Sequence, residues 1–278
     1  MNAGLAVMRL AGGAILSALL AAAAAAEPCA LAAGPSHAVV RALDGETLLL
    51  DDGQEVRLIG ALAPKPDVLG ADAADWPPAR EALDALQRLI HDRTVMLRFE
   101  GRRRDRYGRT LAQVFVSDGG GDFWLQERLL LEGYARAYTL PGNTACLGTL
   151  LEAEAQARAV ERGLWRRDTY RVRTADDVDG LLKAVGRFVL VEGRVAGVTR
   201  AQTTTYINFG ADWRRDFTAS LATSTVTRSA DGATRVDALS GKRVRVRGWI
   251  ERRNGPMIVL GSLDEIELLD EANSAPQP

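Results

Sequence analysis

The sequence has little of several residue types, and each scarcity excludes a class of protein. The 278 residues include only 2 histidines and 2 cysteines, and two cysteines without histidine support cannot form a structural zinc site. Lysine plus arginine (35) and aspartate plus glutamate (36) leave a formal net charge of −1. This balance excludes the strongly basic character of a non-specific nucleic-acid binder, so any anion binding must be local.

Apolar residues, by contrast, are present in normal supply. Hydrophobic residues make up 47% of the sequence and charged residues 26%, a composition that excludes global disorder. A chain of 278 residues exceeds the usual size of one domain. We therefore expect two compact domains.

The N-terminus has the features of an export signal. Arg9 is the only charge before an apolar run at residues 10–26, which ends in small residues, with alanine at each of positions 24–26. This pattern predicts a secretory signal peptide over residues 1–26. A transmembrane anchor is the alternative, although the run is short and rich in alanine. We expect a mature protein from about Glu27 that is periplasmic or secreted, with no membrane attachment after cleavage.

Both cysteines, Cys29 and Cys146, lie in the mature chain. An even pair in an oxidising compartment is expected to form a disulfide, and two separate thiols are the alternative. The histidines, His37 before the first strand and His91 at a helix end, have surroundings that predict no ligand or base role.

Hydrophobic periodicity predicts a mainly β fold with helices, of the α+β class. In the N-terminal half, strands are expected at residues 39–43, 47–51, 54–60, 94–100 and 110–117, and helices at residues 77–91, 122–132 and 146–162. Five strands beside helices indicate an OB-type barrel. Residues 168–183 are predicted as a linker, residues 184–270 as a second, OB-like β domain, and residues 271–278 as a disordered tail.

Three short segments carry the functional signal. They are Leu-Asp-Gly-Glu-Thr at residues 43–47, Val-Arg-Leu-Ile-Gly at residues 56–60, and Asp-Arg-Tyr-Gly-Arg at residues 105–109. An arginine on a tight glycine-containing turn holds a planar fork of donors that suits a phosphate. In this order and spacing, with Pro-Gly-Asn-Thr at residues 141–144 and Gly-Leu-Trp at residues 163–165, the segments resemble the staphylococcal nuclease (thermonuclease) family over residues 38–167. The resemblance implies a barrel domain of that type at residues 27–167.

Members of that family use Ca²⁺ and two arginines to hydrolyse phosphodiesters of DNA or RNA. The resemblance implies that Arg57 and Arg109 are the catalytic arginines, which clamp a phosphate and offset charge in the transition state. It also implies that Glu46 stands where the family has its first metal ligand. The residues it places against a bound nucleotide are Arg106, Tyr107 and Tyr138.

The other acidic positions depart from the family pattern. Leu62 stands where the family has a second carboxylate ligand, and Lys65 stands where it has its catalytic glutamate. Ca²⁺ takes about six to eight oxygen ligands, several of them anionic, whereas Glu46 and Lys65 together carry no net charge. Asp67 or Asp51 could replace a ligand only if the loop took a different path. We therefore expect no cofactor, with Ca²⁺ implied only for an active site.

Two classes of function follow from these departures. The first is an exported protein that binds nucleic acid or nucleotide phosphate and is weak or inactive as a nuclease, or serves as a periplasmic protein-interaction module. The second is an active metal-dependent endonuclease with a rearranged site. For Arg57 and Arg109, salt bridges with Asp44 or Asp105 at the rim of the predicted barrel are an alternative to phosphate binding.

The predicted C-terminal domain also mixes aromatic and basic residues. Trp213 and Trp249 each lie within a few residues of two arginines, as in the stacking grooves of OB folds. Tryptophans in the core with solvated arginines are the alternative.

Overall fold

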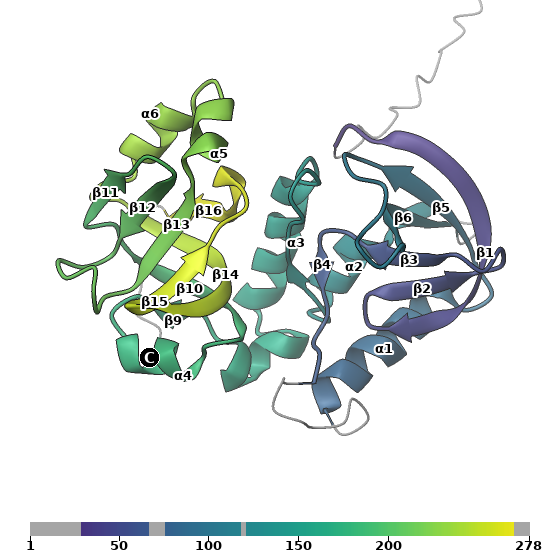
Figure 1. Ribbon diagram of the computed structural model, residues 1–278. Helices are drawn as coiled ribbons and strands as arrows, with labels where there is room; N and C mark the ends of the chain where they lie inside the picture. The colour runs from purple at the N-terminus through teal and green to yellow at the C-terminus, as the bar shows by residue number, and fades with distance from the viewer. Residues whose placement is uncertain (1–28, 67–75, 118–120, 270–278) are drawn as a thin grey trace, which may run out of the picture.

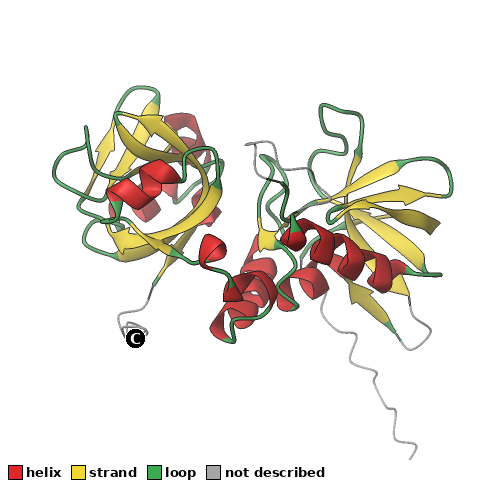
Figure 2. Ribbon diagram, turned by 90° about the horizontal axis from the view of Figure 1, so that it is seen from below, coloured by secondary structure: helices red, strands yellow, loops and turns green. Residues whose placement is uncertain are grey.

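The computed structural model describes residues 29–66, 76–117 and 121–269 (Figures 1 and 2). The predicted signal peptide and the predicted C-terminal tail lie outside these residues. Figure 1 shows two β-rich halves with helix α3 between them. Within the described ranges, no helix has the length and apolar composition needed to span a membrane.

The N-terminal half is a small closed barrel. Its strands are β1 (Ala32–Asp44), β2 (Thr47–Leu50), β3 (Glu55–Leu58), β5 (Thr94–Phe99), β6 (Thr110–Ser117) and β7 (Asp122–Trp124), hydrogen-bonded in the order β3-β2-β1-β5-β6-β7. A parallel pairing of β3 with β6 closes the barrel. The long strand β1 pairs with both β2 and β5, and register shifts let it bend from one to the other. This arrangement fits the OB-like fold expected for this half.

Helices α1 (Pro77–Ile90), α2 (Leu125–Leu131) and α3 (Leu147–Ala159) pack beside the barrel. The strand predicted at residues 39–43 begins earlier, at Ala32, because its first part pairs with β5. The helix predicted from residue 122 begins at Leu125, because residues 122–124 pair with β6 and place Trp124 on Phe115. Two short strands, β4 (Ala61–Leu62) and β8 (Arg136–Ala137), pair outside the barrel.

The second half, called here the C-terminal β region (residues 173–268), is built on one larger sheet. Its elements are β9 (Arg173–Thr174), α4 (Val178–Lys183), β10 (Phe188–Arg194), β11 (Gly197–Arg200), β12 (Thr204–Asn208), β13 (Thr218–Ala222), α5 (Thr223–Arg228), α6 (Gly232–Asp237), β14 (Arg243–Arg253), β15 (Gly255–Val259), η4 (Leu263–Glu265) and β16 (Ile266–Leu268). The strand order is β11-β12-β13-β15-β14-β10-β9, and β16 pairs with β14. Two 3-10 helices, η2 (Gly163–Arg166) and η3 (Asp168–Tyr170), lead into it from the barrel. Part of the predicted linker belongs to this sheet, since β9 pairs with β10.

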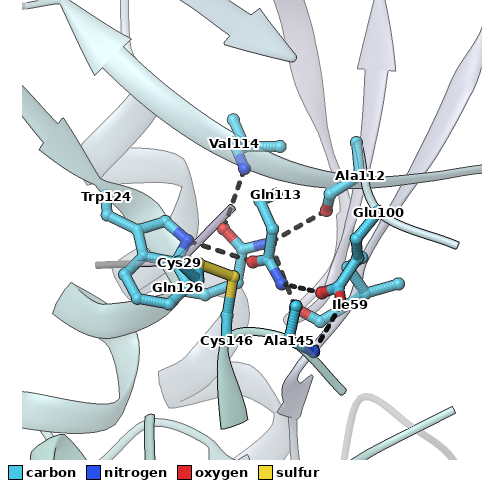
Figure 3. The surroundings of a disulfide bond; sticks show 10 residues. All are labelled: Cys29, Ile59, Glu100, Ala112, Gln113, Val114, Trp124, Gln126, Ala145 and Cys146. Atoms are coloured by element: carbon cyan, nitrogen blue, oxygen red, sulfur yellow. Dashed lines mark hydrogen bonds between the residues drawn. A yellow bond between two sulfur atoms is a disulfide. The ribbon is translucent and has the colours of Figure 1, made fainter. Parts of the chain in front are cut away.

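A disulfide bond joins Cys29 to Cys146, with the Cα atoms 5.1 Å apart (Figure 3). It ties the start of the described chain to the residue that precedes α3. Beside it, the buried amide of Gln113 accepts a hydrogen bond from Trp124 Nε1 (3.0 Å) and donates one to Glu100 (3.0 Å). Buried polar groups satisfied in this way hold neighbouring elements in one arrangement.

The two halves are held together by a buried ion-pair network. Arg247 on β14 is 2% exposed and donates to the Glu154 carboxylate on α3 (2.9 Å) and to the Ala137 carbonyl (3.1 Å). These two bonds come from Nη1, and Nη2 donates to Glu267 on β16 (2.5 Å). An apolar cluster lies at the same junction, formed by Leu62, Ala157, Trp165, Phe188 and Leu190. The halves therefore meet across a buried interface with both apolar and charged contacts.

Candidate phosphate-binding cleft

A cleft of about 630 Å³ lies between the barrel and the C-terminal β region. The barrel side includes Glu46, Arg57 and Arg109, which the sequence predicts as the catalytic and metal-binding residues. The opposite side includes Phe188 and Trp249. One cavity of a size typical for small-ligand sites thus contains groups from both halves.

Arg57 extends from β3 into the barrel rim and is buried. Its guanidinium lies 3.1 Å from Glu46 Oε2 and donates to the carbonyls of Leu58 and Ala61 (2.9 Å to Ala61). Burial lowers the pKa of Arg57, and the negative charge of Glu46 opposes that decrease. The arginine is therefore a buried, fixed cation whose partner is Glu46.

Glu46 is held by three donors at once. It is 1% exposed, and an Asx-type hydrogen bond from its own backbone nitrogen to Asp44 (2.8 Å) fixes the turn between β1 and β2. One carboxylate oxygen accepts from Ala63 N (2.8 Å) and pairs with Arg57 (3.1 Å). The other oxygen lies 2.6 Å from Lys65 Nζ. Each oxygen of this carboxylate thus has a cationic partner.

Arg109 follows the tight turn at residues 105–108. Gly108 has φ = +84° there, a conformation that glycine adopts without strain. Asp105 accepts hydrogen bonds from the backbone nitrogens of Tyr107 (2.8 Å) and Arg109 (3.0 Å) and from Arg109 Nε (2.7 Å). Burial opposes the ionisation of Asp105, but these hydrogen bonds outweigh it and lower the pKa of this carboxyl. The turn therefore fixes the Arg109 fork, which also contacts Thr47 Oγ1 at 3.4 Å.

Arg57 and Arg109 lie close enough for their charges to interact. Burial is the main cause of the lowered pKa of Arg57, and the positive charge of Arg109 lowers that pKa further. Sequence analysis gave salt bridges with Asp44 or Asp105 as the alternative role of these two arginines. The structure contains one of these salt bridges, between Arg109 and Asp105, whereas Arg57 pairs with Glu46. These pairs hold both guanidiniums in place at the cleft.

The structure brings the predicted nucleotide-contact residues into this cleft as well. Arg106 donates to the Tyr107 hydroxyl (2.5 Å), and Tyr107 is 68% exposed. Tyr138 packs edge-on against Phe188, with ring centroids 5.7 Å apart. All six residues predicted for the site line the cavity, namely Glu46, Arg57, Arg106, Tyr107, Arg109 and Tyr138.

The residues present do not fit a Ca²⁺ ion. Glu46 already pairs with Arg57 and Lys65, and Leu62 is buried in the apolar cluster between the two halves. Asp51 does not line the cleft and instead pairs with His37 (3.1 Å). Asp67 lies outside the described residues. Asp44 lies 3.9 Å from the same Lys65 ammonium, and Asp105 pairs with Arg109. Carboxylates that are each paired with a cation do not offer the free anionic oxygens that Ca²⁺ requires.

Sequence reasoning missed Arg136, a cleft residue on β8. Its guanidinium lies over the rings of Tyr170 (5.0 Å) and Phe188 (4.9 Å) and donates to the Phe188 carbonyl. Burial lowers the pKa of Arg136. The one signal in the sequence was the position of Arg136 between Ala135 and Ala137 in a short apolar run. An arginine in such a run is expected to lie inside the fold.

Fold and site together define a barrel of the nuclease type, with one arginine on a barrel strand and one directly after an Asp-x-x-Gly turn. The chain belongs to the staphylococcal nuclease homologue family, whose model matches residues 55–167. Thermonuclease of Staphylococcus hyicus is 32% identical over 133 residues, which cover 47% of this chain and 75% of that protein. Thermonuclease of Staphylococcus intermedius is 31% identical over 137 residues, which cover 48% of this chain and 78% of that protein.

A further relative is endonuclease YncB of Bacillus subtilis (strain 168). It is 32% identical over 133 residues, which cover 47% of this chain and 61% of that protein. These matches confirm the family that the three motif segments predict, and residues 55–167 form a nuclease-family domain.

Proposed function

We propose that this protein is an exported member of the family that binds nucleic acid or nucleotide phosphate in the cleft without a metal ion and hydrolyses phosphodiesters weakly or not at all. The observation that carries the proposal is the Lys65 ammonium 2.6 Å from Glu46. A cation fixed on the remaining ligand repels a metal ion and neutralises the carboxylate that would hold it.

Phosphate binding is supported by the local charge. Among the described residues that line the cleft, seven are cationic and two are anionic. They are Arg57, Lys65, Arg102, Arg106, Arg109, Arg136 and Arg187 against Glu46 and Asp105. In a chain with a net charge of −1, this concentration of positive charge favours an anionic ligand at this place. Charge-assisted hydrogen bonds from guanidinium groups are suited to phosphate oxygens.

Hydrolysis needs more than this clamp. A water molecule must lose a proton as it attacks the phosphate. The position implied for the general base holds Lys65, whose ammonium has no lone electron pair with which to accept that proton. The arginines stabilise transition-state charge but cannot remove that proton. We therefore expect binding with little turnover.

Export is supported by the Cys29–Cys146 disulfide, since such bonds form and persist in oxidising compartments. Cleavage of the predicted signal peptide would leave Cys29 close to the new N-terminus. We also propose that the C-terminal β region is the OB-like domain predicted at residues 184–270. Strand β14 supports this, because it pairs with β10 and β16 along one part and with β15 along the other.

The direct test is a digestion assay of the mature protein on plasmid DNA and RNA, with Ca²⁺, with other divalent metals and with chelator. We expect no metal-dependent cleavage above the level of a mock purification. In parallel, calorimetry in chelator should detect a nucleoside 3′,5′-bisphosphate, with Kd between tens of micromolar and millimolar, as expected for roughly two charge-assisted clamps.

A matched pair of variants locates the binding site. Arg109→Ala should weaken bisphosphate binding, whereas Arg88→Ala, on the exposed face of α1 and outside the cleft, should not. Metal-dependent cleavage that is lost in Glu46→Gln would instead establish an active nuclease with a rearranged site. Absence of all bisphosphate binding would leave the protein-interaction role.

A further inference from the structure

We infer that the C-terminal β region supplies a base-stacking subsite to the nuclease cleft, with Trp249 as its contact face. The ligand is then a nucleotide or a single-stranded nucleic acid whose phosphate lies at Arg57 and Arg109 while an unpaired base lies on Trp249. This inference rests on the proposed phosphate binding and adds the nature of the group attached to the phosphate.

Trp249 is exposed although it lies in the cleft. It is on β14, is 46% exposed and lines the same cavity as the two clamp arginines. Large aromatic side chains left open in a cavity are characteristic of binding sites, because their burial by a ligand is favourable. The alternative of a core tryptophan is wrong for this residue.

The indole is one end of an aromatic row. Trp249 packs edge-on against Phe188 (5.8 Å between ring centroids), and Phe188 packs edge-on against Tyr138 (5.7 Å). Phe188 belongs to β10 and Tyr138 follows β8, so the row crosses the junction of the two halves. A ring fixed by such neighbours loses little rotamer freedom when a base stacks on it.

Arg136 gives a second, independent reason to expect an anionic ligand here. It is 9% exposed, lines the cleft and lies over Phe188. In the described part of the chain, its Nε has no hydrogen-bond partner and its guanidinium forms no ion pair with a carboxylate. A buried cation without an ion-pair partner is unfavourable and is stabilised by a nearby anion. A phosphate in the cleft would supply that anion beside the aromatic row.

The same geometry selects against duplex nucleic acid. Bases in a duplex stack on each other and present only their edges, so they cannot lie flat on one indole ring. Sequence-tolerant binding of single strands combines a basic groove with aromatic rings in this way. The cleft contains both groups, the cations mainly from the barrel and the exposed indole from the C-terminal β region.

The test compares two probes that differ only in the base. Calorimetry in chelator would measure Kd for thymidine 3′,5′-bisphosphate and for the matching abasic deoxyribose 3′,5′-bisphosphate. The parent protein should bind the probe with the base more tightly, by roughly 5- to 150-fold, the range for stacking of one base on an aromatic side chain. Trp249→Ala should remove that difference and leave the affinity for the abasic probe unchanged, which also shows that the variant is folded.

Trp213→Ala is the matched control. Trp213 is also exposed (52%) and lies in the same β region, but its ring packs against Arg214 and does not line the cleft. This variant should keep the full preference for the probe with the base. Three outcomes would overturn the inference: equal affinity of the parent for both probes, an unchanged preference in Trp249→Ala, or an equal loss of both affinities in that variant. In each of these cases the proposed phosphate binding still stands, whereas failure of the parent to bind either probe overturns both.

Discussion

The ammonium group of Lys65 lies 2.6 Å from the Glu46 carboxylate, where a metal ion would have to bind if Glu46 were its ligand. Glu46 is buried and also pairs with Arg57, so it has two cationic partners. The lysine is about half exposed, and its charge is therefore partly screened by solvent. Each of the two oxygens of Glu46 nevertheless has a cationic partner.

The first prediction concerns metal binding. Calorimetry of the parent protein at millimolar Ca²⁺ should show no binding at the cleft, because both oxygens of Glu46 already pair with the cations Arg57 and Lys65. Lys65→Glu reverses the charge at the exposed position and should create weak Ca²⁺ binding, whereas the neutral Lys65→Gln should not. A Kd below about 100 μM in the parent that is lost in Glu46→Ala would contradict this view of the site.

The second prediction concerns the other lost ligand. Leu62 is 6% exposed and packs with Phe188 and Trp165 between the two halves. Leu62→Asp should lower the free energy of unfolding by about 2–4 kcal/mol, because it places an unpaired carboxylate in an apolar cluster. Urea denaturation measures the change, and Leu62→Met, which keeps volume and polarity, should cost less than about 1.5 kcal/mol. Equal stability of the two variants would show that the cluster admits water.

This packing changes how the family site could be restored. From the sequence alone, replacing Leu62 and Lys65 by carboxylates would be the obvious way to recover Ca²⁺-dependent hydrolysis. In the structure, Leu62 packs in the apolar cluster between the barrel and the C-terminal β region. Lys65→Glu is therefore the cleaner variant, because it acts at an exposed position without affecting the interface.

Local patterns made most of the barrel predictable. The patterns at residues 47–51, 54–60, 94–100 and 110–117 predicted strands that are present. Each of these strands is short and pairs with another of them that is its neighbour in the chain. The start of β1 was missed, since Ala32–Ser36 has no strand-like pattern and is extended only because it pairs with β5, about sixty residues away.

The candidate site was predictable to the same extent. Arg57 and Arg109 belong to recognisable segments, and the structure places both at the cleft. Arg136 and Phe188 were missed as cleft residues because their contact joins positions 52 apart in the sequence. Such contacts depend on how two halves dock, and no local pattern encodes that.

The third prediction concerns the disulfide. The bond between Cys29 and Cys146 closes a loop with a sequence separation of 117, for which the loop-entropy estimate gives about 4–5 kcal/mol of stabilisation. The double variant Cys29→Ser/Cys146→Ser should lose roughly that amount in urea denaturation. Dithiothreitol should lower the melting temperature of the parent but not of the double variant. Intact mass of the parent without reductant should be two hydrogens below the dithiol form, and two alkylatable thiols in native protein would disprove the bond.

The last prediction concerns the pH dependence of the interface between the two halves. Glu267 accepts hydrogen bonds from Arg247 (2.5 Å) and Arg245 (3.0 Å), and Arg247 in turn bonds Glu154 on α3. Burial opposes the ionisation of Glu267, but the positive charges of the two arginines outweigh it, so the pKa of this carboxyl lies below its ordinary value of 4.5. A carboxyl whose pKa is lowered by folding stabilises the folded state fully above its unfolded pKa, and this contribution is lost as pH falls through the folded value. The parent should therefore lose stability below about pH 4.5 partly through this group.

Glu267→Gln should already be less stable at neutral pH, by about 1.5–3 kcal/mol for lost charged hydrogen bonds, and should show a shallower decline in acid. Urea denaturation from pH 7 to pH 3 measures both effects, with Glu251→Gln as the control because Glu251 pairs with Arg253 on the exposed surface. An acid decline as steep in Glu267→Gln as in the parent would assign the pH dependence to other carboxyl groups.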